Sequence, residues 1–130
     1  MSFDVAKKFI DIILNPDPQS AEYIDSRNSI ACIIEFIGGE PFLAIDLIEQ
    51  IVNYFIEQII IQDHPWQYNY RIDICSNGTL YFTPKVQAFL KKYKNHLSFN
   101  ISIDGNKELH DACRIFPDGS GSYDIAMAAV

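Results

Sequence analysis

Three short segments of the sequence combine glycine with small polar or acidic side chains that could bind a ligand. They are Gly38-Gly39-Glu40-Pro41, Ser76-Asn77-Gly78 and Ser102-Ile103-Asp104-Gly105. Each segment alone has a simpler explanation as a turn, because glycine permits a tight change of direction. In the first segment, Glu40 also places a negative charge near the N-terminus of a helix that Pro41 could begin. Short motifs match by accident, so no single segment predicts a site.

Cysteine and histidine do not form a motif for metal binding or hydrolysis. The chain has three residues of each type: Cys32, Cys75, Cys113, His64, His96 and His110. The cysteines are odd in number and widely spaced, so neither a disulfide framework nor a Cys-x-x-Cys metal site is expected. Cys32 and Cys75 are expected to be small buried hydrophobic residues. The histidines are expected to be solvated at the surface, and no catalytic residue or metal ligand is predicted.

The spacing of apolar residues predicts helices that alternate with strands. A first helix begins after the N-cap Ser2 and ends at Asn15. Further helices are predicted over residues 41–59 and 84–93, and a last helix is capped by Ser122 or Asp124 after a polar loop. Strands are predicted over residues 30–37, 70–75 and 97–103. The first of these strands is expected to be buried on both faces.

This alternation places the three glycine-containing segments at equivalent positions in the fold. Strands joined by helices form βαβ units, which predict an α/β fold with a parallel sheet and right-handed crossovers. Each of the three segments directly follows one predicted strand. Ligands of parallel sheets bind at the carboxyl ends of the strands, where loop side chains and backbone donors converge. The three segments are therefore expected to form one site.

Length and charge limit the class of protein. With 130 residues, of which 48% are hydrophobic, residues 1–130 can form one domain. The 17 acidic and 10 basic residues give a net charge of −7, which repels nucleic acids and anionic membranes. Neither is expected as a partner. The unpaired cysteines and the lack of a signal peptide predict a cytoplasmic protein.

Three strands also leave two open sheet edges, because a closed barrel of this type needs at least twice as many. The chain is therefore expected to be a fragment, a degraded paralogue, or half of something assembled by pairing. Such a domain could also form a homo-oligomer by pairing its open edges with those of a second copy.

Taken together and in order, four segments resemble the radical SAM enzymes. They are FIGGEP at residues 36–41, CSNGTL at 75–80, ISIDGNKELHDACR at 101–114 and DGSGSYD at 118–124. Among these enzymes, the chain looks most like the SPASM-type peptide and sulfatase maturases, and the resemblance covers nearly all of it. It implies an α/β fold that is a partial (β/α) TIM-like barrel, in which the three parallel strands are strands two to four of a radical SAM barrel.

The resemblance also implies contacts with S-adenosylmethionine. The nine residues concerned are Gly38, Gly39, Glu40, Pro41, Ser76, Asn77, Ser102, Asp104 and Arg114. The first segment would hold the amino group of the methionyl part, because an ammonium group favours carbonyl oxygens and a carboxylate. Ser102 and Asp104 would reach the ribose or the methionyl carboxylate. Arg114 would pair with a carboxylate of the cofactor, or else form a structural salt bridge.

One hallmark of this family is absent from the 130 residues. It is Cys-x-x-x-Cys-x-x-Cys, whose three thiolates hold a [4Fe-4S] cluster. No cluster is therefore expected on this chain. The expected function is that of a fragment of a radical SAM peptide maturase, inactive alone, whose intact form would make a 5′-deoxyadenosyl radical and act on a peptide or protein. The alternative is a catalytically dead binding domain that self-associates through its sheet edges.

Overall fold

The computed structural model describes residues 1–26 and 28–130, and in this part of the chain helices and strands alternate. The elements are α1 (Phe3–Leu14), β1 (Cys32–Phe36), α2 (Ile45–Ile61), β2 (Tyr70–Ser76), α3 (Pro84–Tyr93), β3 (Leu97–Ile101), α4 (Lys107–Cys113) and α5 (Tyr123–Ala128). Short 3-10 helices lie at Ser20–Glu22, Pro41–Ala44 and Pro65–Tyr68. No helix in this part of the chain is long and apolar enough to cross a membrane.

The strands form one parallel sheet in the order β1-β2-β3, which confirms the predicted α/β fold. The backbone N–H of Cys32 donates to the carbonyl of Asn69 at 3.1 Å, and that of Ser102 donates to the carbonyl of Ser76 at 2.9 Å. The outer edges of the sheet therefore belong to β1 and β3. The chain divides into two compact units, and the division falls within β1 and β2.

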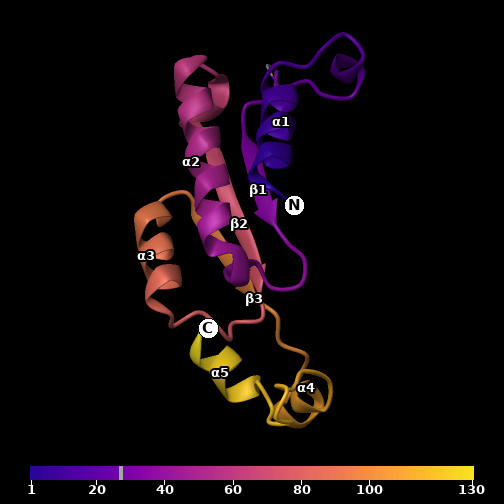
Figure 1. Cartoon of the computed structure of the whole chain (residues 1–130), viewed down its shortest axis with the longest axis vertical. Helices are drawn as coiled ribbons and strands as arrows, with labels where there is room; N and C mark the ends of the chain where they lie inside the picture. Colours follow the sequence, from indigo (N-terminus) through magenta and orange to yellow (C-terminus); the bar gives the residue numbers. More distant parts are fainter. Residues whose placement is uncertain (27) are drawn as a thin grey trace. The chain divides into compact units, whose positions relative to one another are not determined.

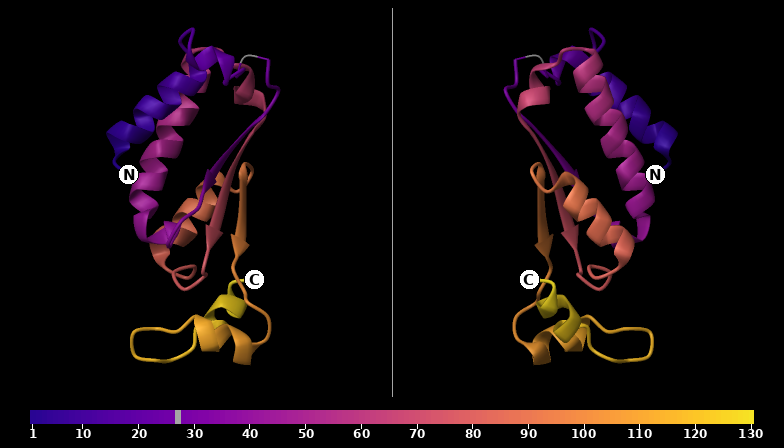
Figure 2. Two further views of the ribbon diagram at one scale, coloured as in Figure 1. Left: turned by 90° about the vertical axis from the view of Figure 1, so that its right-hand side faces the viewer. Right: turned by 90° about the vertical axis from the view of Figure 1, so that its left-hand side faces the viewer.

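The first unit contains residues 1–34 and 46–72 and is built on the pair of helices α1 and α2 (Figures 1 and 2). Ser2 caps α1 as predicted, because its hydroxyl accepts a hydrogen bond from the N–H of Val5. The rings of Phe3 and Tyr54 meet edge to face at 5.9 Å, and the Tyr54 hydroxyl donates to Asp11 at 2.5 Å. The side chains with no exposed surface are Leu14, Val52, Phe55, Ile59, His64 and Ile72.

The second unit contains residues 35–45 and 73–130 and holds all three segments that follow the strands. Helix α3 has the predicted bounds and buries Val86, Phe89 and Tyr93. On β2 and β3, the Asp73 carboxylate accepts a hydrogen bond from the Ser98 hydroxyl at 2.7 Å. Helices α4 and α5 lie beside each other, joined by an extended loop (Figure 2).

Two predictions about these elements are wrong. β1 is not buried on both faces, because its residues alternate between half-buried and exposed and Ile33 keeps 67% of its surface. The segment after β3 is not only a loop, since α4 forms within it. Asn106 begins this helix by accepting a hydrogen bond from the N–H of Leu109 at 3.0 Å, and it follows Gly105 at a φ of 78°.

Candidate functional site

The carboxylate of Glu40 joins the ends of two strands. Its Oε1 accepts hydrogen bonds from the Ser76 hydroxyl at 2.8 Å and from the N–H of Phe42 at 3.0 Å. Its Oε2 accepts one from the N–H of Asn77 at 2.8 Å. A carboxylate offers about four acceptor positions, so one position of Glu40 remains for a further donor.

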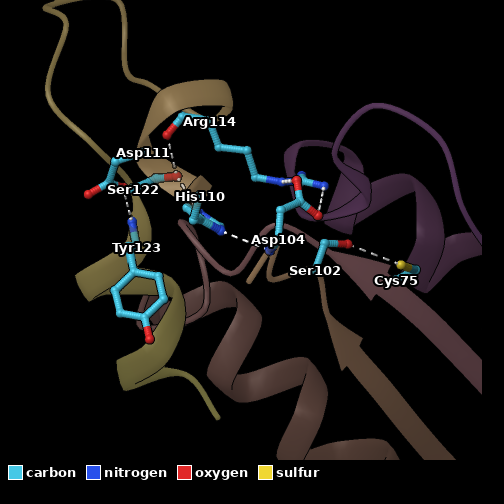
Figure 3. A network of polar contacts seen from close by, with 8 residues as sticks. All are labelled: Cys75, Ser102, Asp104, His110, Asp111, Arg114, Ser122 and Tyr123. Atoms are coloured by element: carbon cyan, nitrogen blue, oxygen red, sulfur yellow. Dashed lines mark hydrogen bonds and ion pairs between the residues drawn. The ribbon is translucent and has the colours of Figure 1, made fainter. Parts of the chain in front are cut away.

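The ends of β2 and β3 are joined in turn at Ser76. Its carbonyl accepts the hydrogen bond from Ser102, and its buried hydroxyl accepts one from the N–H of Gly78 at 3.0 Å. The Cys75 thiol lies 3.6 Å from the Ser102 hydroxyl (Figure 3). The three segments are therefore linked in one row, the strand-end rim, which contains Glu40, Ser76, Asn77 and Ser102. The prediction that they meet at one edge is confirmed.

Asn77 and Gly78 form a tight turn within this rim. The side-chain oxygen of Asn77 accepts hydrogen bonds from the N–H of Thr79 at 2.9 Å and from its hydroxyl at 2.7 Å. Gly78 has a φ of 79°, and a Cβ at this position would meet Ile101 and Ala126. Glycine is required at this turn for both reasons.

Arg114 forms a salt bridge with Asp104. Its Nε donates to Oδ2 of Asp104 at 2.6 Å and its Nη2 to Oδ1 at 3.3 Å (Figure 3). These hydrogen bonds lower the pKa of the Asp104 carboxyl below its usual value. The side chains of Arg114 and Asp104 keep 36% and 50% of their surface exposed. Of the two roles considered for Arg114, the structure has the salt bridge, although the guanidinium group keeps further N–H donors.

Behind this salt bridge, His110 connects three segments of backbone. Its Nδ1 accepts a hydrogen bond from the N–H of Asp104 at 3.2 Å, and its Nε2 lies 3.1 Å from the Ser122 hydroxyl. The Ser122 hydroxyl donates to the carbonyl of Arg114 at 2.9 Å, so Nε2 of His110 must be the donor to it. His110 therefore links the backbones of Asp104 and Arg114, the second through the Ser122 hydroxyl.

The expectation that the histidines are solvated is wrong for His64 and His110, which have no exposed surface. Burial is tolerated because their ring nitrogens accept backbone hydrogen bonds: Nδ1 of His64 accepts one from Trp66 at 3.3 Å, as His110 does from Asp104. The burial of His110 could have been predicted from its position four residues after Asn106, which puts it on the inner side of α4. That helix was not predicted, so the burial was missed.

A hollow of about 290 Å³ lies beside the rim. Its walls come from the turn after β2 and from the loop that follows α4. The lining residues are Asn77, Thr79, Cys113, Arg114, Ile115, Phe116, Pro117 and Ser122. Only Asn77 and Arg114 were predicted as site residues. The contribution of residues 115–117 could not be read from the sequence, because nothing in it shows that this loop folds back to the turn.

The cysteines of the described residues do not fit a three-thiolate cluster. Cys32 and Cys75 are half-buried rather than fully buried, and Cys113 is exposed. Burial raises the pKa of Cys32 to about 11, so its thiol stays protonated at neutral pH. Within residues 1–26 and 28–130, no three side chains of cysteine, histidine, aspartate or glutamate are grouped closely enough to hold a metal ion.

Comparison with known proteins supports the resemblance seen in the motifs. No protein-family model matches the chain. It is 34% identical over 122 residues to an uncharacterised protein of Methanocaldococcus jannaschii. The aligned region covers 94% of this chain and 35% of that protein. It is also 30% identical over 100 residues to a cysteine-type anaerobic sulfatase-maturating enzyme of Clostridium novyi, with 76% of this chain and 25% of that enzyme covered.

The fold is similar to solved structures of the sulfatase-maturating enzyme anSMEcpe. With bound AdoMet, that enzyme matches 99% of this chain at a TM-score of 0.69 and 23% identity, and 30% of its own chain is covered. With AdoMet and the Kp18Cys peptide, the TM-score is 0.67. This chain is similar to part of a radical SAM sulfatase-maturating enzyme. It spans a quarter to about a third of the length of the sulfatase-maturating enzymes and the other relative.

Proposed function

We propose that this chain forms the part of a radical SAM peptide maturase that binds the methionyl end of S-adenosylmethionine. The observation that carries the proposal is the strand-end rim, in which Glu40 contacts Ser76 and Asn77 while Ser76 contacts Ser102. The solved enzyme structures with a similar fold have bound AdoMet. We propose that residues 1–130 act in this way as one partial radical SAM domain.

The groups of the rim fit the two charges of an amino acid. The remaining acceptor position of Glu40, with the backbone carbonyls of Gly38 and Gly39, would hold the ammonium group beside Pro41. Ser102, Asp104 and Arg114 would reach the carboxylate or the ribose, and the spare N–H donors of Arg114 suit an anionic group. Bound S-adenosylmethionine would supply the 5′-deoxyadenosyl radical chemistry of the intact enzyme. This chain's own residues would orient the amino acid end.

A peptide is the proposed substrate of the intact enzyme. Two of the similar solved structures contain the peptides Kp18Cys and Cp18Cys. We place the protein in the cytoplasm, because its three free cysteines suit a reducing compartment.

A titration of the isotope-labelled chain, followed by nuclear magnetic resonance, tests whether the rim binds the methionyl end of S-adenosylmethionine. We expect weak binding, in which S-adenosylmethionine and methionine shift the amide signals of Gly39, Asn77 and Ser102 together. Adenosine alone should leave these signals unchanged, because we propose that these residues bind the methionyl end and not the adenine. Shifts caused by adenosine but not by methionine would contradict the proposal, and so would methionine shifts confined to α1.

We also propose that this chain alone does not assemble the catalytic cluster. Anaerobic reconstitution with iron and sulfide should therefore give no stable brown absorbance. Stable, stoichiometric cluster binding would contradict this part of the proposal. The second candidate, a binding domain without catalysis, is favoured by the absence of three grouped cysteines among the described residues. An upstream in-frame Cys-x-x-x-Cys-x-x-Cys in the gene would favour the enzyme fragment instead.

A further inference from the structure

Arg114 lines the hollow beside the rim, but its salt bridge with Asp104 is too exposed to fix its position. An exposed ion pair is screened by water and contributes little to holding a long side chain in one geometry. The salt bridge uses Nε and Nη2, so Nη1 is the part of the guanidinium group that it leaves for a ligand. A ligand carboxylate can use Nη1 well only if a less exposed group holds this arginine in place.

His110 is a buried group that connects both partners of this salt bridge (Figure 3). Its Nδ1 accepts the hydrogen bond from the N–H of Asp104. Its Nε2 contacts the Ser122 hydroxyl, which donates to the carbonyl of Arg114. The backbone carbonyl of His110 also accepts the N–H of Arg114 at 2.8 Å. One residue therefore fixes the backbone on both sides of the ion pair.

The imidazole of His110 is itself held by helix α5. The ring of Tyr123 meets it edge to face, with the ring centroids 5.6 Å apart. The carboxylate of Asp111, the next residue of α4, accepts the N–H of Tyr123 and so ties the two helices together. These residues belong to the second unit, which also contains the strand-end rim. A buried side chain with hydrogen-bond partners keeps its position better than an exposed one.

We propose that His110 is a positioning residue, which holds Arg114 so that its guanidinium group binds the carboxylate of the ligand in the hollow. This role rests on the proposed function, in which Arg114 reaches that carboxylate. His110 acts through Arg114 and does not touch the ligand, because it has no exposed surface and does not line the hollow. Loss of His110 therefore weakens the contact with the carboxylate and leaves the contact of Glu40 with the ammonium group unchanged.

Methionine and methioninol separate this role from a general effect on the fold, because methioninol has a hydroxyl group in place of the carboxylate. Titrations followed by nuclear magnetic resonance give both dissociation constants from the amide signals of Gly39 and Asn77. His110→Phe should raise the dissociation constant of methionine at least about fivefold and change that of methioninol less than about twofold. His110→Asn should bind methionine more tightly than His110→Phe, because its side-chain oxygen can replace Nδ1 as the acceptor for Asp104.

His64→Phe is the matched control. His64 is as fully buried as His110, and its Nδ1 also accepts a backbone N–H, that of Trp66. It belongs to the first unit and does not line the hollow. This variant should leave both dissociation constants unchanged. Circular dichroism would first establish that all three variants are folded.

The positioning role is overturned if His110→Phe binds methionine as tightly as the unaltered protein, or if it weakens methionine and methioninol equally. No recovery in His110→Asn would also contradict it. An unaltered protein that binds neither compound would contradict the proposed function itself, and this role with it. A further test needs no variant: the spin coupling across the hydrogen bond from the Asp104 amide to Nδ1 of His110 should persist with methionine bound. Loss of this coupling on binding would contradict the role.

Discussion

At the scale of single residues, Glu40 joins the ends of two strands and is also the residue that we propose binds the ligand. Resemblance to the radical SAM enzymes assigned it to the ligand, and its carboxylate accepts three hydrogen bonds from its own chain. The sequence could show that Glu40 follows a strand and precedes a helix. It could not show that Ser76 and Asn77, which lie 36 and 37 positions further along, are the donors.

Glu40→Gln should destabilise the protein even without a ligand. In either orientation, the new amide group directs its NH₂ at the N–H of Phe42 or of Asn77, which then loses its acceptor. We expect a loss of about 1–3 kcal/mol in the free energy of unfolding, measured with urea. Glu35→Gln, on the exposed face of β1, should change it by less than about 0.5 kcal/mol. Equal effects of the two substitutions would show that the Glu40 contacts do not hold the rim.

At the scale of elements, prediction succeeded where local signals were complete. Pro84 and the apolar positions after it fixed both ends of α3, and Ser2 fixed the start of α1. It failed for α4, which has seven residues and therefore too few turns for a periodic pattern. The burial of His110 depends on that helix. The exposure of Ile33 depends on the position of β1 in the sheet, which local sequence does not contain.

The contact between α1 and α2 predicts a dependence on alkaline pH. The hydrogen bond to Asp11 raises the pKa of Tyr54 to about 12, from about 10 in an unfolded chain. Since the folded state favours the protonated phenol, this contribution to stability is complete below about pH 10 and is lost as the pH rises towards 12. Absorbance of tyrosinate should show one late titration that Tyr54→Phe removes. An unchanged titration in Tyr54→Phe would contradict this assignment.

The loop between α4 and α5 depends on one glycine for space. A Cβ at Gly121 would overlap the carboxylate of Asp111, which accepts the hydrogen bond from the N–H of Tyr123 at 2.9 Å. Gly121→Ala should therefore lower the free energy of unfolding by about 1–3 kcal/mol. Gly39→Ala is the control, because no atom lies within 4 Å of the added carbon. The explanation fails if thermal unfolding shows the two variants to be equally stable.

At the scale of the whole molecule, topology explains why the meeting of the three segments in the strand-end rim could be predicted before the structure. In a parallel sheet every strand ends at the same edge, so segments far apart in sequence had to meet once the βαβ order was recognised. The division into two units could not be predicted from the sequence. Nor could the residues that line the hollow beside Asn77 and Arg114. Those features depend on the path of loops such as residues 115–121.

The central claim is that the strand-end rim binds the methionyl end of S-adenosylmethionine. The most direct measurement is a crystal structure of this chain grown with a saturating concentration of that molecule. We predict its amino group within hydrogen-bond distance of the Glu40 carboxylate, with its carboxylate directed towards Ser102 and Arg114. A molecule bound away from all three residues, or no bound molecule at saturation, would contradict the claim.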